Sequence, residues 1–96
     1  MTKLVISPQA RRDIDVIWDQ SVSRWGAERT ERYLRDLWRT LEMAAEDPRR
    51  GQSCNEIRAG YFKIRVTSHV AFYRLTSDWI DVVRILHGRM DFEKHL

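Results

Sequence analysis

The chain has 96 residues, of which 43% are hydrophobic and 32% are charged, and its formal net charge is +3. This composition fits one small globular domain and argues against intrinsic disorder, which requires fewer apolar side chains. One cysteine excludes an internal disulfide and a cysteine-rich zinc site, and no apolar stretch suits a signal peptide or a membrane span, so we expect a cytoplasmic protein without metal or cofactor.

The N-terminal half predicts one strand followed by two helices. Lys3–Ile6 is a short strand candidate, and Ser7 with Pro8 forms a helix start, because serine caps a helix and proline suits its first position. Gly26 can end the first helix, and Pro48 stops the second. Two amphipathic helices joined by one glycine predict an αα-hairpin.

Apolar residues recur every three or four positions along both helices and predict the faces that pack against a sheet. The first stripe contains Ile14, Ile17, Trp18 and Trp25, and the second contains Leu34, Leu37, Trp38, Leu41, Ala44 and Ala45. The three tryptophans in these stripes are therefore expected in the core rather than stacked on a ligand.

After the second helix the period of the sequence changes. Residues 49–57 are polar and predict a surface loop, and three strand candidates follow at residues 59–66, 69–75 and 79–87. Their short connections predict hairpins. The expected fold is α+β: an N-terminal strand, an α-helical hairpin and a three-stranded antiparallel meander forming one sheet. We expect a single domain, residues 1–96, with residues 88–96 as a C-terminal tail.

Alternation along the strands predicts two different sheet faces. The residues expected on the face toward the helices are Phe62, Ile64, Ala71, Tyr73, Val83 and Ile85. Lys63, Arg65, Arg74 and Arg84 are expected on the opposite face, with Arg58 and Arg89 at its margins. Phe72 shares this opposite, open face, where it suggests a docking point for an apolar partner residue.

The basic residues of the second half suggest an anionic partner. Residues 49–89 carry eight basic and three acidic side chains, a net charge of +5. Such a face can bind an acidic protein segment or nucleic acid, or it can be an ordinary solvated surface.

The histidines are candidates for acid–base chemistry, since a nuclease needs a general base and a general acid. His87 is the best placed, and His69 opens the middle strand, where a neighbouring strand end could lie close. Strand alternation nevertheless turns His87 toward the helices, which predicts a packed strand end. We therefore predict no catalytic residue among the histidines.

Four stretches, SPQARRDIDVIWDQSVSRWG, EDPRRGQ, GYFKIRVTSHVAFYR and RILHGRMD, resemble ParE toxins of bacterial type II toxin–antitoxin modules, within the RelE/ParE superfamily. The resemblance runs from Leu4 to Leu96 and implies a helical hairpin over a sheet that includes the N-terminal strand. It also implies a hetero-oligomer with a ParD-like antitoxin, whose ribbon-helix-helix half binds operator DNA. The implied target is DNA gyrase, poisoned so that cleaved DNA persists, and no membrane is implied.

The residues expected to bind the antitoxin or the target are Arg58, Tyr61, Lys63, Arg65, Phe72, Arg74, Arg84, Arg89 and Met90. The RelE branch instead cuts mRNA on the ribosome with basic sheet residues and a tyrosine or histidine near the C-terminus. No tyrosine follows Tyr73 here, which favours the ParE branch and implies a toxin that acts by binding, without enzymatic activity of its own. A RelE-type ribosome-dependent mRNA endonuclease and a non-toxic binding module or corepressor subunit remain the alternatives.

Overall fold

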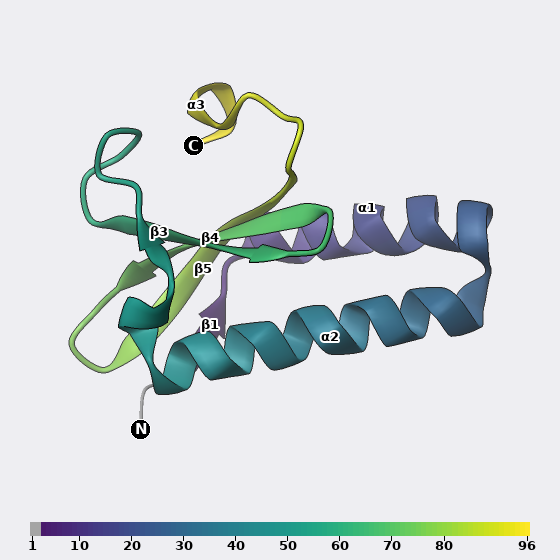
Figure 1. Cartoon of the computed structure of the whole chain (residues 1–96), viewed down its shortest axis with the longest axis horizontal. Helices are drawn as coiled ribbons and strands as arrows, with labels where there is room; N and C mark the ends of the chain where they lie inside the picture. Colours follow the sequence, from purple (N-terminus) through teal and green to yellow (C-terminus); the bar gives the residue numbers. More distant parts are fainter. Residues whose placement is uncertain (1–2) are drawn as a thin grey trace.

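A helical hairpin packs against one face of a five-stranded sheet in the computed structural model, which describes residues 3–96 (Figure 1). The elements are β1 (Lys3–Ile6), α1 (Pro8–Trp25), α2 (Ala27–Glu46), a 3₁₀ turn (Pro48–Arg50), β2 (Gln52–Ser53), β3 (Tyr61–Val66), β4 (His69–Leu75), β5 (Trp79–His87) and α3 (Phe92–His95). The α+β fold is as predicted. The predicted domain also includes residues 1–2, which lie outside the described residues.

Both helices begin and end where their capping residues predict. The backbone N–H of Ala10 donates to Ser7 Oγ at 3.1 Å, so Ser7 caps α1 ahead of Pro8. Gly26 separates the helices at φ +85°, a left-handed conformation that favours glycine, and its N–H donates to the Val22 carbonyl. Within residues 3–96, neither these helices nor the short α3 has the length and apolarity that crossing a bilayer requires.

The sheet has five strands rather than the predicted meander of three, in the order β1-β5-β4-β3-β2. The meander of β3, β4 and β5 is confirmed, and β1 joins its edge parallel to β5. On the other edge, Gln52 and Ser53 pair with β3 inside a segment predicted to be loop. A two-residue strand carries no periodicity, which is why alternation could not reveal it.

The core lies between the hairpin and the sheet. Its buried residues come from both layers: Ala10, Ile17, Leu37, Leu41, Ala44, Ala45, Val66, Ala71, Tyr73, Ile80, Val82 and Ile85. Tyr73 is fully buried, with its hydroxyl donating to the Pro48 carbonyl at 2.6 Å and accepting from the Gly51 N–H at 3.2 Å. This tyrosine therefore fixes the 3₁₀ turn against the sheet.

A bulge in β5 reverses one predicted orientation. Phe72 pairs with Arg84, but the next residue, Tyr73, pairs with Val82, so Val83 is an extra residue in β5. Val82 consequently faces the helices, and Val83 packs on the opposite face. The predicted position of Val83 is wrong because an inserted residue shifts the alternation by one.

Two of the three tryptophans expected in the core lie at the surface. Trp25 is 39% exposed and Trp38 is 45% exposed, whereas Trp18 is half-buried. In Figure 1 the hairpin extends well beyond the strands at the end where α1 meets α2. Trp25 lies at that tip, where no strand remains to cover it, and Trp38 lies on the flank of α2 beside the buried Leu37.

Candidate functional site

The predicted basic residues do share one surface, which we call the outer face: the side of the sheet opposite the hairpin. Lys63, Phe72 and Arg84 stand in one row across β3, β4 and β5, and Tyr61 pairs with Arg74. Arg65 lies two residues beyond Lys63 on the same side of β3. The strand alternation therefore placed these six side chains correctly relative to one another.

The outer face is not open, because the chain covers it with its own C-terminal segment. Phe72 is 0% exposed, and the ring of Phe92 lies edge-on against it with centroids 4.8 Å apart. Leu96 and Ile57 pack on the same buried cluster. The expectation that Phe72 is open to a partner is wrong, since Phe92 of α3 already occupies that position.

Three of the predicted binding cations hold α3 in place. Arg58 donates from Nη1 to the Leu96 main-chain oxygen at 2.6 Å, and Arg84 donates from Nη1 to the His95 carbonyl at 3.0 Å. Lys63 Nζ lies 6.0 Å from the centroid of the Phe92 ring, within the range of a cation–π contact. The predicted tail at residues 88–96 is therefore a docked segment.

Two arginine charges of the outer face, those of Arg84 and Arg74, are neutralised within the fold. Arg84 holds Asp13 of α1 with two hydrogen bonds, Nε to Oδ2 at 2.8 Å and Nη2 to Oδ1 at 2.9 Å. Their side chains are only 18% and 14% exposed, and the hydrogen bond to Asp13 raises the pKa of Arg84. Arg74 donates to Asp81 Oδ2 at 2.8 Å, which raises the pKa of Arg74.

The predicted site residues that stay exposed lie near the end of the sheet where β3 and β5 finish. Arg65 is exposed and donates to the Thr67 carbonyl at 3.3 Å, and Arg89 and Met90 are also exposed. Within residues 3–96, no carboxylate oxygen lies within 4.0 Å of Lys63, Arg65 or Arg89. Tyr61 is half-buried, with the Arg58 guanidinium 5.5 Å from its ring centroid.

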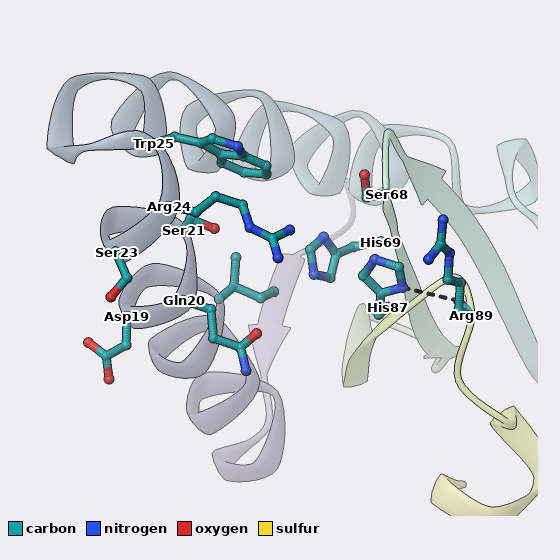
Figure 2. A pocket seen from close by; sticks show the side chains of 11 residues that line it. Asp19, Gln20, Ser21, Ser23, Arg24, Trp25, Ser68, His69, His87 and Arg89 are labelled. Carbon is teal, nitrogen blue, oxygen red and sulfur yellow. Dashed lines mark hydrogen bonds between the residues drawn. The ribbon is translucent and has the colours of Figure 1, made fainter.

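A second candidate site lies on the helix side, at the far end of β4 and β5. It is a groove of about 980 Å³, which we call the histidine groove, between the C-terminal part of α1, the β3–β4 turn and the end of β5 (Figure 2). The lining side chains used below are Ser21, Arg24, Trp25, His69, His87 and Arg89.

The two histidines of this groove are direct neighbours across the sheet. His69 pairs with His87 in the β4–β5 register, and their rings lie edge to face with centroids 5.4 Å apart. Tyr33 of α2 donates its hydroxyl proton to the Val66 carbonyl, and its oxygen lies 2.6 Å from His69 Nδ1, which must then carry a proton. Burial, and to a smaller extent His87, lowers the pKa of His69.

His87 is exposed, so the prediction of a packed strand end is wrong. It does lie on the helix side, as alternation predicted, but the groove leaves its ring uncovered (Figure 2). Its Nδ1 accepts the Arg89 backbone N–H at 3.2 Å, which leaves Nε2 as the protonated nitrogen of the neutral ring. The contact between His69 and His87 could not be fixed from the sequence, because the bulge at Val83 changes the register.

The site contains no arrangement typical of a metal centre in the part of the chain that the structure describes. Within residues 3–96, no three His, Cys, Asp or Glu side chains are grouped so that they could hold a metal ion. The expectation that the protein uses no cofactor stays a prediction.

Comparison with known proteins gives consistent matches over nearly the whole chain. The sequence profile of the family described as "ParE toxin of type II toxin-antitoxin system, parDE" matches residues 4–92. Toxin ParE1 of Mycobacterium tuberculosis (strain CDC 1551 / Oshkosh) is 45% identical over 96 residues, covering 99% of this chain and 98% of that protein. Toxin ParE1 of Caulobacter vibrioides is 42% identical over 91 residues, covering 95% and 94%.

The fold also matches a solved structure. A chain of the chromosomal ParDE TA system from P. aeruginosa superposes with a TM-score of 0.80, covering 91% of this chain and 96% of that chain. The sequence identity is 20%, so this likeness concerns the fold.

Proposed function

This chain belongs to the ParE toxin family of type II toxin–antitoxin systems, and we propose that it poisons DNA gyrase and is neutralised by a ParD-like antitoxin. The observation that carries the proposal is identity of 42–45% to named ParE1 toxins over nearly the full length of both chains. Agreement of this extent includes the whole sheet and hairpin rather than one motif.

We propose that the toxin acts in the cytoplasm by binding rather than by its own chemistry. The outer face, where a RelE-type nuclease would need free basic groups, uses Arg74 and Arg84 in ion pairs with carboxylates of the same chain. Arg58 is also engaged, with α3. These contacts support a scaffold role for cations that would otherwise stabilise a phosphoryl transition state.

The antitoxin segment is proposed to bind along the outer face beside α3. The apolar surface formed by Phe92 and Leu96 is bordered by Lys63 and Arg65, which have no carboxylate partner within residues 3–96. An acidic segment carrying apolar side chains complements such a surface, because arginine binds carboxylates with paired hydrogen bonds. Binding of operator DNA would then be indirect, through the ribbon-helix-helix half of the antitoxin.

The antitoxin site can be tested by reversing one free charge. We expect Arg65→Glu to weaken binding of the ParD-like partner by about tenfold or more in a calorimetric titration, since repulsion replaces a charge-assisted contact. The matched control is Arg39→Glu on α2, whose side chain is 68% exposed and lies away from the outer face. Equal affinities for Arg65→Glu and the unchanged chain would refute this location.

The target can be tested by inducing the protein without its antitoxin. Persistent double-strand breaks together with filamentous cells are expected if gyrase is poisoned. Intact DNA with rapid loss of full-length mRNA would instead support a ribonuclease, and normal growth would leave a non-toxic binding module.

One observation favours the ribonuclease alternative. His69 and His87 are adjacent and Tyr33 contacts His69, so two groups suited to proton transfer share one groove. Under the gyrase proposal, His87→Gln should leave mRNA levels after induction unchanged from those with the unsubstituted toxin. Restoration of full-length mRNA by this substitution would favour the nuclease.

A further inference from the structure

The histidine groove brings together two arginines that have no counter-charge. Arg24 lies in the last turn of α1, and Arg89 follows β5. Figure 2 shows the Arg24 side chain extending from α1 toward His69, with Arg89 beyond His87. Within residues 3–96, no carboxylate oxygen lies within 4.0 Å of either guanidinium, and Asp19 is the one acidic residue that lines the groove.

Neutral hydrogen-bond donors line the same groove. The bond that His87 Nδ1 accepts from Arg89 leaves its Nε2–H available as a donor, and Ser21 and Ser23 line the wall formed by α1. The groove therefore offers two guanidinium groups, an imidazole N–H and hydroxyl groups within one concave surface. Such a set is suited to a ligand with several oxygen acceptors and negative charge.

We propose that the histidine groove binds the phosphate group of a nucleotide, either free or within a nucleic acid strand. A carboxylate presents two oxygens in one plane to one guanidinium. The oxygens of a phosphate are arranged tetrahedrally, with three terminal ones in a monoester and two in a diester, so donors from both walls can reach the same group. At about 980 Å³ the groove is also much larger than a phosphate ion, and Trp25 adds an aromatic surface beside it.

The groove and the outer face are separate surfaces, so this inference does not depend on the identity of the toxin's target. Arg24 and Arg89 reach the groove, whereas Arg74 and Arg84 are paired on the outer face. A phosphate in the groove would be the counter-ion of Arg24 and Arg89, just as carboxylates of the chain itself are the counter-ions of Arg74 and Arg84.

Binding should strengthen as the pH falls. The titratable groups that face His69 are Tyr33 from α2 and His87 from β5, and the charged groups around the groove are Asp19, Arg24 and Arg89. Because burial lowers the pKa of His69, the ring is neutral at pH 7 and gains its charge in more acidic solution. A phosphodiester keeps its charge over this range, so the change in affinity would report on His69.

The first test uses the full chain and the imidazole resonances of its three histidines. Titration with inorganic phosphate, and then with a nucleoside monophosphate, should shift the NMR signals of His69 and His87 in a saturable way. His95 lies on α3, outside the groove, and should remain unshifted as an internal reference. No shift of His69 and His87 with either ligand would overturn the proposal.

The second test separates a strand from a free nucleotide and identifies the residues. Fluorescence anisotropy measures the affinity of a labelled single-stranded oligonucleotide, and competition by the nucleoside monophosphate gives the affinity of the free nucleotide. Much tighter binding of the oligonucleotide assigns the site to a strand. Similar affinities assign it to a nucleotide. Arg24→Ala and Arg89→Ala should each weaken binding by about tenfold.

The charge-matched control is Arg39→Ala, which also removes one exposed arginine but lies outside the groove. It should bind like the unsubstituted chain. Equal weakening by Arg39→Ala and Arg24→Ala would overturn the proposal, because it would show non-specific attraction by net charge. Shifts of His69 and His87 caused by an acidic peptide, but not by phosphate, would do the same and would indicate a protein ligand.

Discussion

The outer face and the histidine groove are both rich in basic residues, yet they use them in opposite ways. On the outer face, Arg84 and Arg74 each donate to a carboxylate at 2.8 Å, and Arg58 holds the end of α3. In the groove, Arg24 and Arg89 line an open surface beside an exposed histidine. The difference shows that the pairing of a cation, rather than its presence, decides whether it stabilises the fold or is available to a ligand.

The largest expected effect tests the paired side of this comparison. Arg84→Ala leaves Asp13 with the Ile85 N–H as its partner, in a site where both side chains of the pair are less than one-fifth exposed. We expect the free energy of unfolding to fall by roughly 2–4 kcal/mol in urea denaturation, toward the range for breaking a buried ion pair. Arg39→Ala, which breaks a pair exposed by 68% on both sides, should change it by less than about 0.5 kcal/mol. Similar losses in the two variants would contradict the claim that the buried Arg84–Asp13 pair stabilises the fold more than an exposed pair does.

The next effect tests whether α3 belongs to the fold. Phe92→Ala removes the ring that covers Phe72 and should lower the free energy of unfolding by roughly 1–2 kcal/mol, less than for a core phenylalanine because Phe92 is only half-buried. Met90→Ala, on an exposed side chain of the same segment, is the control and should be nearly neutral. A neutral Phe92→Ala would mean that α3 does not contribute to the stability of the outer face.

A smaller effect concerns the pH dependence of the groove. The pKa of His69 is lowered in the folded chain, so below about pH 6.5 the unfolded chain binds a proton that the folded chain does not. The stability contributed by the neutral His69 ring is therefore present at neutral pH, and it is lost as the pH falls from about 6.5 toward the lowered pKa of the folded chain. Urea denaturation at several pH values measures how the free energy of unfolding changes with pH. His69→Gln should lose this slope, and His87→Gln should keep most of it. An unchanged slope in His69→Gln would show that another group is responsible.

The smallest effect on stability should come from the unpaired cations, and it sharpens the contrast with Arg84. Arg24→Ala removes an exposed side chain without a carboxylate partner in the described chain, so the free energy of unfolding should change by less than about 0.5–1 kcal/mol, mostly through its position at the end of α1. Thermal and urea denaturation measure this, and the loss should appear in phosphate affinity instead. A large loss of stability would show that Arg24 has a structural role.

Local features of the sequence determined most of the architecture. Ser7 and Gly26 bound α1 through capping and backbone conformation, Pro48 stops α2, and the short connections predicted the meander. The strand bounds at 69–75 and 79–87 were also predictable, because both runs are rich in β-branched and aromatic residues and are bounded by short turn sequences. Each of these features depends on residues close together in the chain, where propensity and periodicity act directly.

The tertiary structure alone decided how the site residues are used. Arg84 and Asp13 are 71 residues apart in sequence, so their ion pair arises only when α1 packs on β5. The cover that Phe92 places over Phe72, and the meeting of His69 with His87, likewise need the docked α3 and the register that the bulge sets. Charge and strand alternation predicted which residues share a face. Pairing and exposure depend on contacts between distant segments, and these contacts pair most arginines of the outer face while leaving those of the groove unpaired.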